Sequence, residues 1–165
     1  MIIGISGKLQ SGKDTTADYL IKKYGFMRIA FADKLKEIAK DLFFWDGEKD
    51  DYGRKLLQDI GVAMRKVKED VWVNYVLQKV NDNRLVTKNW VITDVRFKNE
   101  ADLVRLSGGT LWRIERKLDR THEANKHISE VDLDDYEHFD TIINNFGTMN
   151  ELYEKIDLLL KGELN

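Results

Sequence analysis

The chain has 165 residues, of which 27 are Lys or Arg and 29 are Asp or Glu, contains no cysteine and carries a formal charge of −2 at pH 7. This length suits one domain, and the lack of cysteine excludes disulfides, cysteine-ligated zinc and thiol nucleophiles. A slightly acidic chain without a long apolar run does not suit duplex DNA or a membrane, so we expect one cytoplasmic domain, residues 1–165, acting on small molecules.

The first predicted element is a short strand, residues 1–6, which leads into a glycine-rich turn. The sequence Gly7-Lys-Leu-Gln-Ser-Gly-Lys13 fits the pattern G-x-x-x-x-G-K, in which two glycines let backbone N–H groups point at one phosphate. A helix is expected directly after Lys13, so the phosphate would also lie over a helix N-terminus. The alternative is an ordinary turn with an exposed lysine, but the strand before it and the helix after it favour a nucleotide site.

The middle of the chain is predicted to be mainly helical, because apolar residues recur three or four positions apart. After a second strand, the pattern indicates a helix with Asp33 near its N-cap, a polar loop and two further helices. These five elements span residues 25–31, 33–43, 44–53, 54–70 and 71–81.

The second half of the chain is predicted to continue with strand, helix, strand, strand and helix. Thr148 and Glu151 form a capping box at the start of the last helix. Strands that alternate with helices predict an α/β three-layer sandwich with a parallel five-stranded sheet. The elements of this half span residues 90–94, 99–108, 110–116, 140–145 and 148–160.

The strand at 90–94 ends in Asp94, which is a candidate magnesium ligand. Ligands gather at the carboxyl ends of parallel strands, so an acid at that position would lie beside the phosphates as a Walker B residue. A turn acid without a metal is the alternative. Arg96 follows, and an arginine there would give forked contacts to a phosphate unless it is simply solvated.

Asp14 stands directly after the loop lysine, where most phosphate loops carry a Ser or Thr whose hydroxyl binds magnesium. Two hypotheses stay open for it. The carboxylate either stabilises the first turn of the helix, or joins Asp94 in holding hydrated magnesium while Thr15 contacts a phosphate oxygen.

The chain resembles the deoxynucleoside monophosphate kinases of tailed bacteriophages, a branch of the P-loop kinases. The stretches that carry the resemblance are GKLQSGKDTTADYL, FADKLKE, LLQDIGVAMRKVKEDVWV, VITDVRFKNEADLVRLSGG and INNFGTMNELYEKI. The resemblance implies Mg²⁺-dependent transfer of the γ-phosphoryl group of ATP to a deoxynucleoside 5′-monophosphate, giving the diphosphate for phage DNA synthesis. Its implied partners are small nucleotides, with neither polymeric nucleic acid nor a membrane, and it allows a homodimer.

The resemblance also implies roles for individual residues. The residues implied to bind ATP are Gly7, Ser11, Gly12, Lys13, Asp14 and Thr15 at the phosphates, and Asn145, Gly147 and Thr148 beside adenine. Those implied to bind the acceptor are Phe31, Lys34, Arg65, Trp72, Arg96 and Glu100. The implied catalytic residues are Lys13, Asp94, Arg116 and Arg120, with Asp94 at the metal; Asp14 as a second metal residue is the hypothesis given above. An acceptor-binding helical segment would span about 33–83, and a lid-like segment about 116–138.

Two other functions stay open beside this one. The first is a P-loop kinase of a non-nucleotide metabolite, for instance dephospho-coenzyme A or phosphomevalonate, and the second is a nucleotide-binding protein that transfers nothing. Basic residues gather at 65–68 and 113–120, away from the loop lysine. Because the acceptor of a phosphoryl group is itself an anion, these clusters favour a kinase with two substrate sites.

Overall fold

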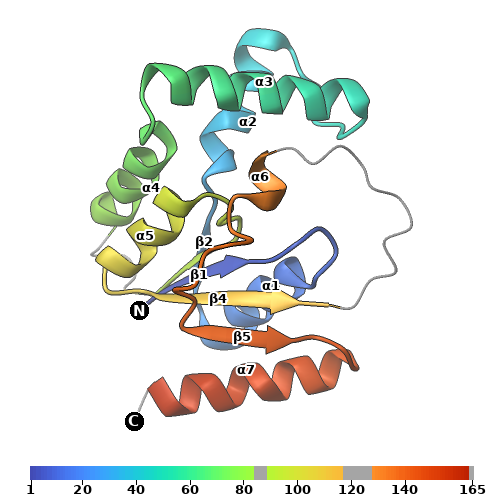
Figure 1. Ribbon diagram of the computed structural model, residues 1–165, viewed down its shortest axis with the longest axis vertical. Coiled ribbons are helices and arrows are strands. Elements are labelled where there is room, and N and C mark those ends of the chain that lie inside the picture. Colours follow the sequence, from blue (N-terminus) through green and yellow to red (C-terminus); the bar gives the residue numbers. More distant parts are fainter. Residues whose placement is uncertain (84–88, 117–127, 164–165) are drawn as a thin grey trace. The chain divides into compact units, whose positions relative to one another are not determined.

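The computed structural model describes residues 1–83, 89–116 and 128–163 of the chain. Helices and strands alternate along it except between β2 and β3, where three helices follow one another, as Figure 1 shows. Their bounds are β1 (Ile2–Ser6), α1 (Lys13–Tyr24), β2 (Met27–Ile29), α2 (Ala32–Phe43), α3 (Asp51–Val67), α4 (Val71–Asp82), β3 (Trp90–Ile92), α5 (Lys98–Leu106), β4 (Thr110–Glu115), α6 (Ile128–Val131), β5 (Thr141–Asn144) and α7 (Met149–Glu163).

The chain folds as two compact units. The sheet unit consists of Met1–Arg28 and Thr87–Asn165, and the helical unit consists of Ile29–Val86. The helical unit holds α2, α3 and α4, and the segment 33–83 that the resemblance assigns to acceptor binding lies within it.

The strands form one five-stranded sheet in the order β2-β3-β1-β4-β5. β1 runs parallel to β3 and to β4, with Gly4 opposite Ile92 and Leu111, and β4 runs parallel to β5, with Ile114 opposite Ile143. The predicted α/β fold with five strands is confirmed. In Figure 1 the carboxyl-terminal ends of β1, β4 and β5 lie on the same side of the sheet, and the glycine-rich loop follows β1 there.

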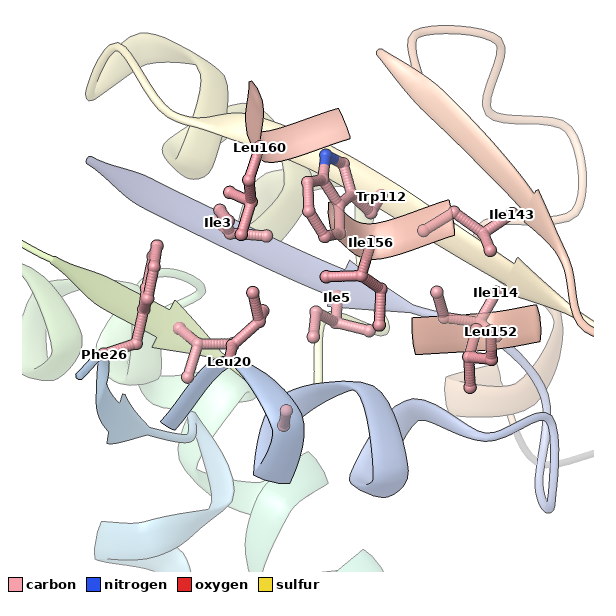
Figure 2. Packing of buried hydrophobic residues seen from close by; sticks show 12 residues of the cluster. Ile3, Ile5, Leu20, Phe26, Trp112, Ile114, Ile143, Leu152, Ile156 and Leu160 are labelled. Atoms are coloured by element: carbon pink, nitrogen blue, oxygen red, sulfur yellow. The ribbon is translucent and has the colours of Figure 1, made fainter. Parts of the chain in front are cut away.

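Helices cover both faces of this sheet. On one face, Ile3 of β1 packs with Leu20 of α1 and Ile156 of α7 in the buried cluster that Figure 2 shows. Side chains alternate along a strand, so Gly4 faces the other way. A Cβ on Gly4 would lie 2.7 Å from Cγ2 of Val104, which belongs to α5. The sheet unit is therefore layered as α1 and α7, the sheet, and α5.

The helical unit has an apolar cluster of its own. Trp45, which follows α2, is 6% exposed, and its Nε1 donates a hydrogen bond to the backbone oxygen of Glu48 at 2.8 Å. Ala39 and Ile60 are the other buried members of this cluster. Partly buried side chains complete it, namely Leu35, Ile38, Leu56, Leu57 and Met64.

The observed elements differ from the predicted ones mainly at their ends. α3 begins at Asp51, inside the expected loop, because the carboxylate of Asp50 accepts the N–H of Gly53 at 2.7 Å and caps the helix. Phe31 is the N-cap of α2, and Asp33 lies in its first turn, where its Oδ2 accepts the N–H of Ala30 at 2.9 Å. The short helix α6 has four residues and was not predicted. No helix in the described part of the chain has both the length and the apolar character that crossing a bilayer requires.

Candidate active site

The loop from Gly7 to Lys13 has a backbone that depends on glycine at two points. Gly7 has φ 148° and Gly12 has φ 106°, both in the region that L side chains rarely adopt. A Cβ on Gly7 would lie 2.4 Å from the backbone oxygen of Ile114, and one on Gly12 would lie 2.4 Å from Nδ2 of Asn145. The loop thus reaches β4 and the end of β5 more closely than any side chain would allow.

Inside the loop, the backbone oxygen of Lys8 is the central acceptor. The ammonium group of Lys13 donates to it at 2.7 Å, and the N–H of Ser11 donates to it at 3.2 Å. The lysine side chain therefore folds back over its own loop. In the next turn, the hydroxyl of Thr16 donates to the oxygen of Gly12 at 3.0 Å, which ties the start of α1 to the loop.

Asn145, directly after β5, supports the loop from the other end of the chain. Its Nδ2 donates to the backbone oxygen of Ser11 at 2.9 Å, and its own N–H donates to the oxygen of Glu115 at 2.7 Å. Asn145 is 8% exposed. The structure thus brings this residue, which the resemblance assigns to adenine, into contact with the phosphate loop.

Gly147 and Thr148, the other two residues assigned to adenine, lie at the start of α7. The N–H of Thr148 donates to Oε2 of Glu151 at 2.7 Å, and the N–H of Glu151 donates back to Oγ1 of Thr148 at 3.3 Å, so the predicted capping box is present. The hydrogen bonds that the Glu151 carboxylate accepts from the N–H and the hydroxyl of Thr148 lower its pKa. A Cβ on Gly147 would overlap the Glu151 carboxylate, so glycine leaves room for this cap.

The loop borders a hollow that fits a phosphate group. Its volume is about 250 Å³, and it is lined by residues 10–15 and by Arg116. The hydroxyl of Ser11 is buried and has no hydrogen-bond partner among the described residues. A buried hydroxyl without a partner and a turn of backbone N–H groups at a helix N-terminus are features that a phosphate would satisfy. Arg116 is exposed and adds a positive charge to the same hollow.

The two acids expected at the metal lie near the loop. Asp14 is exposed in the first turn of α1 and lines the hollow, but the N-cap of that helix is Gly12 and no side-chain hydrogen bond caps it. Asp94 is half-buried two residues after β3. The N–H of Val95 donates to the oxygen of Ile5 at 3.2 Å, which keeps the chain after β3 beside the end of β1. The two hypotheses for Asp14 stay open.

These acids form no ready-made metal cage. The residues that the structure describes contain no group of three or more His, Cys, Asp or Glu able to hold a metal.

Glu100 was expected to bind the acceptor, and the structure shows it fixing the backbone before α5. It is 2% exposed, and its Oε2 accepts the N–H of Arg96 at 2.9 Å and the N–H of Phe97 at 3.1 Å. The carboxylate thus caps the helix and sets the course of the chain at Arg96. Arg96 itself is half-buried and lines a second hollow, which also borders Gly7 and Lys8.

The remaining acceptor residues belong to the helical unit. Phe31 and Trp72 are each 3% exposed. Nζ of Lys34 lies 2.6 Å from Oε1 of Glu37, and this hydrogen bond raises the pKa of Lys34. Arg65 is half-buried, with NH1 3.5 Å from the backbone oxygen of Gly61.

Arg120 lies outside the described residues. So does the part of the predicted lid at residues 117–127, which are not described. Residues 128–138 of that segment belong to the sheet unit, and hydrogen bonds connect them to α5. The N–H of Lys98 donates to Asp132 at 2.8 Å, and the hydroxyl of Tyr136 donates to Asp102 at 2.7 Å.

One group of side chains beside the loop was not predicted as a unit. Nζ of Lys8 forms an ion pair with Asp134, and NH2 of Arg113 lies 3.4 Å from the same carboxylate oxygen. Burial alone would raise the pKa of Asp134, but the hydrogen bonds from the two cations lower it. The sequence gives no local signal for this contact, because Lys8 and Asp134 are 126 positions apart.

Comparison with known proteins shows which family this chain resembles. The model of the family described as deoxynucleotide monophosphate kinase matches residues 43–156. A putative deoxynucleotide monophosphate kinase of Acanthamoeba polyphaga mimivirus is 32% identical over 185 residues, covering 94% of this chain and 94% of that protein. The deoxynucleotide monophosphate kinase of Escherichia phage RB69 is 36% identical over 72 residues, which cover 44% of this chain and 28% of the phage protein.

Solved structures agree with the fold. The crystal structure of shikimate kinase from Aquifex aeolicus matches 99% of this chain and 98% of its own, with a TM-score of 0.54 and 18% identity. At that identity the likeness concerns the kinase fold alone.

Proposed function

The chain belongs to the deoxynucleotide monophosphate kinase family, and on that premise we propose that ATP, bound with Mg²⁺, is the donor from which it phosphorylates a deoxynucleoside 5′-monophosphate. An oxygen of the acceptor phosphate attacks the γ-phosphorus, the bond to the β-phosphate oxygen breaks, and the products are ADP and a deoxynucleoside diphosphate. The observation that carries the proposal is a phosphate loop, Gly7 to Lys13, in a chain whose residues 43–156 match that family.

In this proposal, the donor phosphates lie in the hollow beside the loop. Backbone N–H groups of residues 12–15 and the ammonium group of Lys13 hold them, with the hydroxyls of Ser11 and Thr15. Charge spreads over the oxygens of the moving phosphoryl group, so fixed cations stabilise the transition state. Arg116 is proposed as a second cation because it lines the same hollow. Arg120 is assigned the same role on the resemblance alone.

Asp94 and Asp14 are proposed to hold the magnesium ion. The support is the position of Asp94 after β3, beside the end of β1, and the exposed carboxylate of Asp14 at the hollow. When bound there, Mg²⁺ would neutralise part of the negative charge of the donor phosphates. Asn145, Gly147 and Thr148 would border the adenine, with Asn145 also holding the loop through Ser11.

The acceptor is proposed to bind with residues of the helical unit; for Arg96, which belongs to the sheet unit, the resemblance alone supports the same role. Arg65 and Lys34 supply positive charge for its phosphate, and a forked guanidinium suits a phosphate especially well. Phe31 and Trp72 are buried, so their part is to shape the unit. Glu100 enters the proposal as the residue that holds the backbone at Arg96.

The wider expectations are part of the same proposal. The protein would act in the cytoplasm on small nucleotides, without polymeric nucleic acid, as a monomer or a homodimer. The formal charge of −2 supports the lack of a nucleic acid partner. Sedimentation with and without ATP would measure the assembly state.

A panel of acceptors tests the function. The purified protein is given ATP and Mg²⁺ with each deoxynucleoside monophosphate, each ribonucleoside monophosphate or dephospho-coenzyme A, and ADP release is followed by a coupled assay. We expect ADP release with at least one deoxynucleoside monophosphate, together with the matching diphosphate on chromatography. Turnover of dephospho-coenzyme A alone would favour a metabolite kinase, and ATP binding without any transfer would favour a nucleotide-binding protein.

A further inference from the structure

The part of the phosphate loop that precedes Ser11 is a strained turn. Residues 8–11 form a turn closed by the hydrogen bond from the N–H of Ser11 to the oxygen of Lys8. Gln10, its third residue, has φ 60°, where glycine or asparagine is usual. A non-glycine residue persists in that region only when its surroundings hold it there.

Lys8 links this turn to the catalytic lysine. Its backbone oxygen accepts both the ammonium group of Lys13 and the N–H that closes the turn. A displacement of Lys8 would therefore move the main acceptor inside the loop and, with it, the N–H groups that face the phosphate.

Asp134 holds the other end of Lys8. Its carboxylate pairs with Nζ of Lys8, and the same oxygen lies 3.4 Å from NH2 of Arg113 on β4. Arg113 is well fixed. Its NH1 donates to the backbone oxygen of Leu133 at 2.8 Å, its Nε lies 3.3 Å from Glu115, and its guanidinium carbon lies 5.1 Å from the centre of the Phe139 ring.

From these contacts we propose that Asp134 is a positioning residue of the phosphate loop: through Lys8 it keeps the turn at residues 8–11 in the shape that receives the phosphates of ATP. Only 14% of the Arg113 side chain and 24% of the Lys8 side chain are exposed, against 48% for Asp134. Arg113 thus holds the more exposed Asp134 in place, and Asp134 in turn holds Lys8 of the loop. The inference rests on the proposed function, because it concerns the ATP site.

The chain offers a matched control one residue away. Asp135 pairs with Nζ of Lys98 at 2.9 Å, and both side chains are well exposed. Asp135→Asn removes the same charge from the same turn and breaks an ion pair of the same kind, but that pair does not involve the phosphate loop. A difference between Asp134→Asn and Asp135→Asn therefore reports the contact with Lys8.

The experiment measures the affinity for ATP by calorimetry and the KM and kcat by the ADP-release assay, for the full chain and each variant. We expect Asp134→Asn to raise both the Kd and the KM for ATP about three- to tenfold, as the loss of a partly buried charged hydrogen bond would, with the acceptor KM, kcat and melting temperature close to wild type. Asp135→Asn should match wild type in every one of these quantities.

A second comparison connects the effect to Lys8. Lys8→Gln should weaken ATP binding by a similar factor, and combining it with Asp134→Asn should add little, because both changes break the same contact. Fully additive losses would overturn the inference.

Three outcomes would separate the causes. Equal ATP affinity in wild type and Asp134→Asn would overturn the inference and leave the proposed function intact. Tighter ATP binding in Asp134→Asn would also overturn it, because the carboxylate would then be repelling the donor. Wild-type protein that fails to bind ATP would overturn the proposed function as well.

Discussion

The apolar cluster of the sheet unit and that of the helical unit differ in how completely their side chains are buried. The cluster of Figure 2 joins strands and two helices through side chains such as Leu20 and Ile156, which are fully buried. In the helical unit, the cluster around Trp45 relies on partly buried side chains for most of its members. Segments with fewer buried apolar contacts open at lower free energy. The comparison indicates that the unit with the phosphate loop is the more rigid one.

This difference in rigidity agrees with the two proposed sites, the donor site in the sheet unit and the acceptor residues in the helical unit. Catalysis by fixed charges requires groups that do not reorganise during the reaction, and the loop is tied to β4 and to Asn145. The helical unit exposes large apolar side chains, with Phe44 at 90% and Leu42 at 70%. We therefore expect changes in the sheet unit to affect chemistry or global stability, and changes in the helical unit to affect the acceptor.

The largest expected effect is that of Lys13→Ala on transfer. The ammonium group stabilises charge that grows in the transition state, so its loss should lower kcat by a factor of about 100 to 1,000 or more, equivalent to about 3–4 kcal/mol. Single-turnover kinetics would measure this effect, and thermal melting should be unchanged. Lys22→Ala, on the exposed side of the same helix, is the control and should keep wild-type turnover. Near-normal activity of Lys13→Ala would refute the assignment of the phosphate loop.

Cavities in the two apolar clusters test the comparison directly. Leu20→Ala removes a fully buried side chain from a densely packed cluster, so we expect a loss of about 3–4 kcal/mol in the free energy of unfolding. Ile60 is 8% exposed, and Ile60→Ala should cost about 2 kcal/mol. Urea denaturation measures both. A larger loss for Ile60→Ala would reverse the proposed order of rigidity.

The next prediction separates donor from acceptor. If Arg65 holds the acceptor phosphate, Arg65→Ala should raise the acceptor KM by about tenfold or more, while the KM for ATP changes little. Initial-rate kinetics with each substrate varied in turn would show the difference. Lys66→Ala, at the exposed neighbouring position, should behave as wild type. Equal weakening of both substrates would move Arg65 away from the acceptor.

Asp14 gives a smaller effect that concerns the metal. If its carboxylate helps to hold Mg²⁺, Asp14→Asn should need several times more magnesium for half-maximal activity, with little change in thermal stability. Asp18→Asn removes an exposed charge one turn later in the same helix and should leave the magnesium titration unchanged. If the two variants titrate alike, Asp14 acts only on the first turn of the helix.

The smallest expected effect is a pH dependence of stability in the sheet unit. Burial would raise the pKa of Asp157, but hydrogen bonds from Lys23, Tyr24 and Tyr19 lower it from 3.8 to about 2. A lowered native pKa means that the stabilisation is present above the unfolded value and is lost as the pH falls from about 4 to about 2. Urea denaturation between pH 5 and 2 should show a shallower loss for Asp157→Asn than for wild type. Glu154→Gln, an exposed change on the same helix, should follow the wild-type curve.

Local sequence patterns were sufficient to predict the fold class and the glycines and lysine of the phosphate loop. The spacing of Gly7, Gly12 and Lys13 is contained in seven residues, and each apolar run predicts its own strand or helix. The helix α6 was missed because four residues do not establish a period. The contact between Lys8 and Asp134 was missed because only the folded sheet brings these residues together. Glu100 was assigned to acceptor binding by the resemblance, and the hydrogen bonds that it accepts from Arg96 and Phe97 could not be predicted because they depend on the path of the backbone.

The hydrogen bond between Asn145 and Ser11 also bears on how the protein is made. The loop precedes its support in the chain, because Asn145 lies 134 positions after Ser11. When synthesis has reached residue 100, the loop motif is therefore present without β4, β5 or the amide that holds Ser11. We expect nascent chains to gain ATP affinity only when the last strand has emerged and paired, so the nucleotide would stabilise the chain late in synthesis rather than guide its early folding.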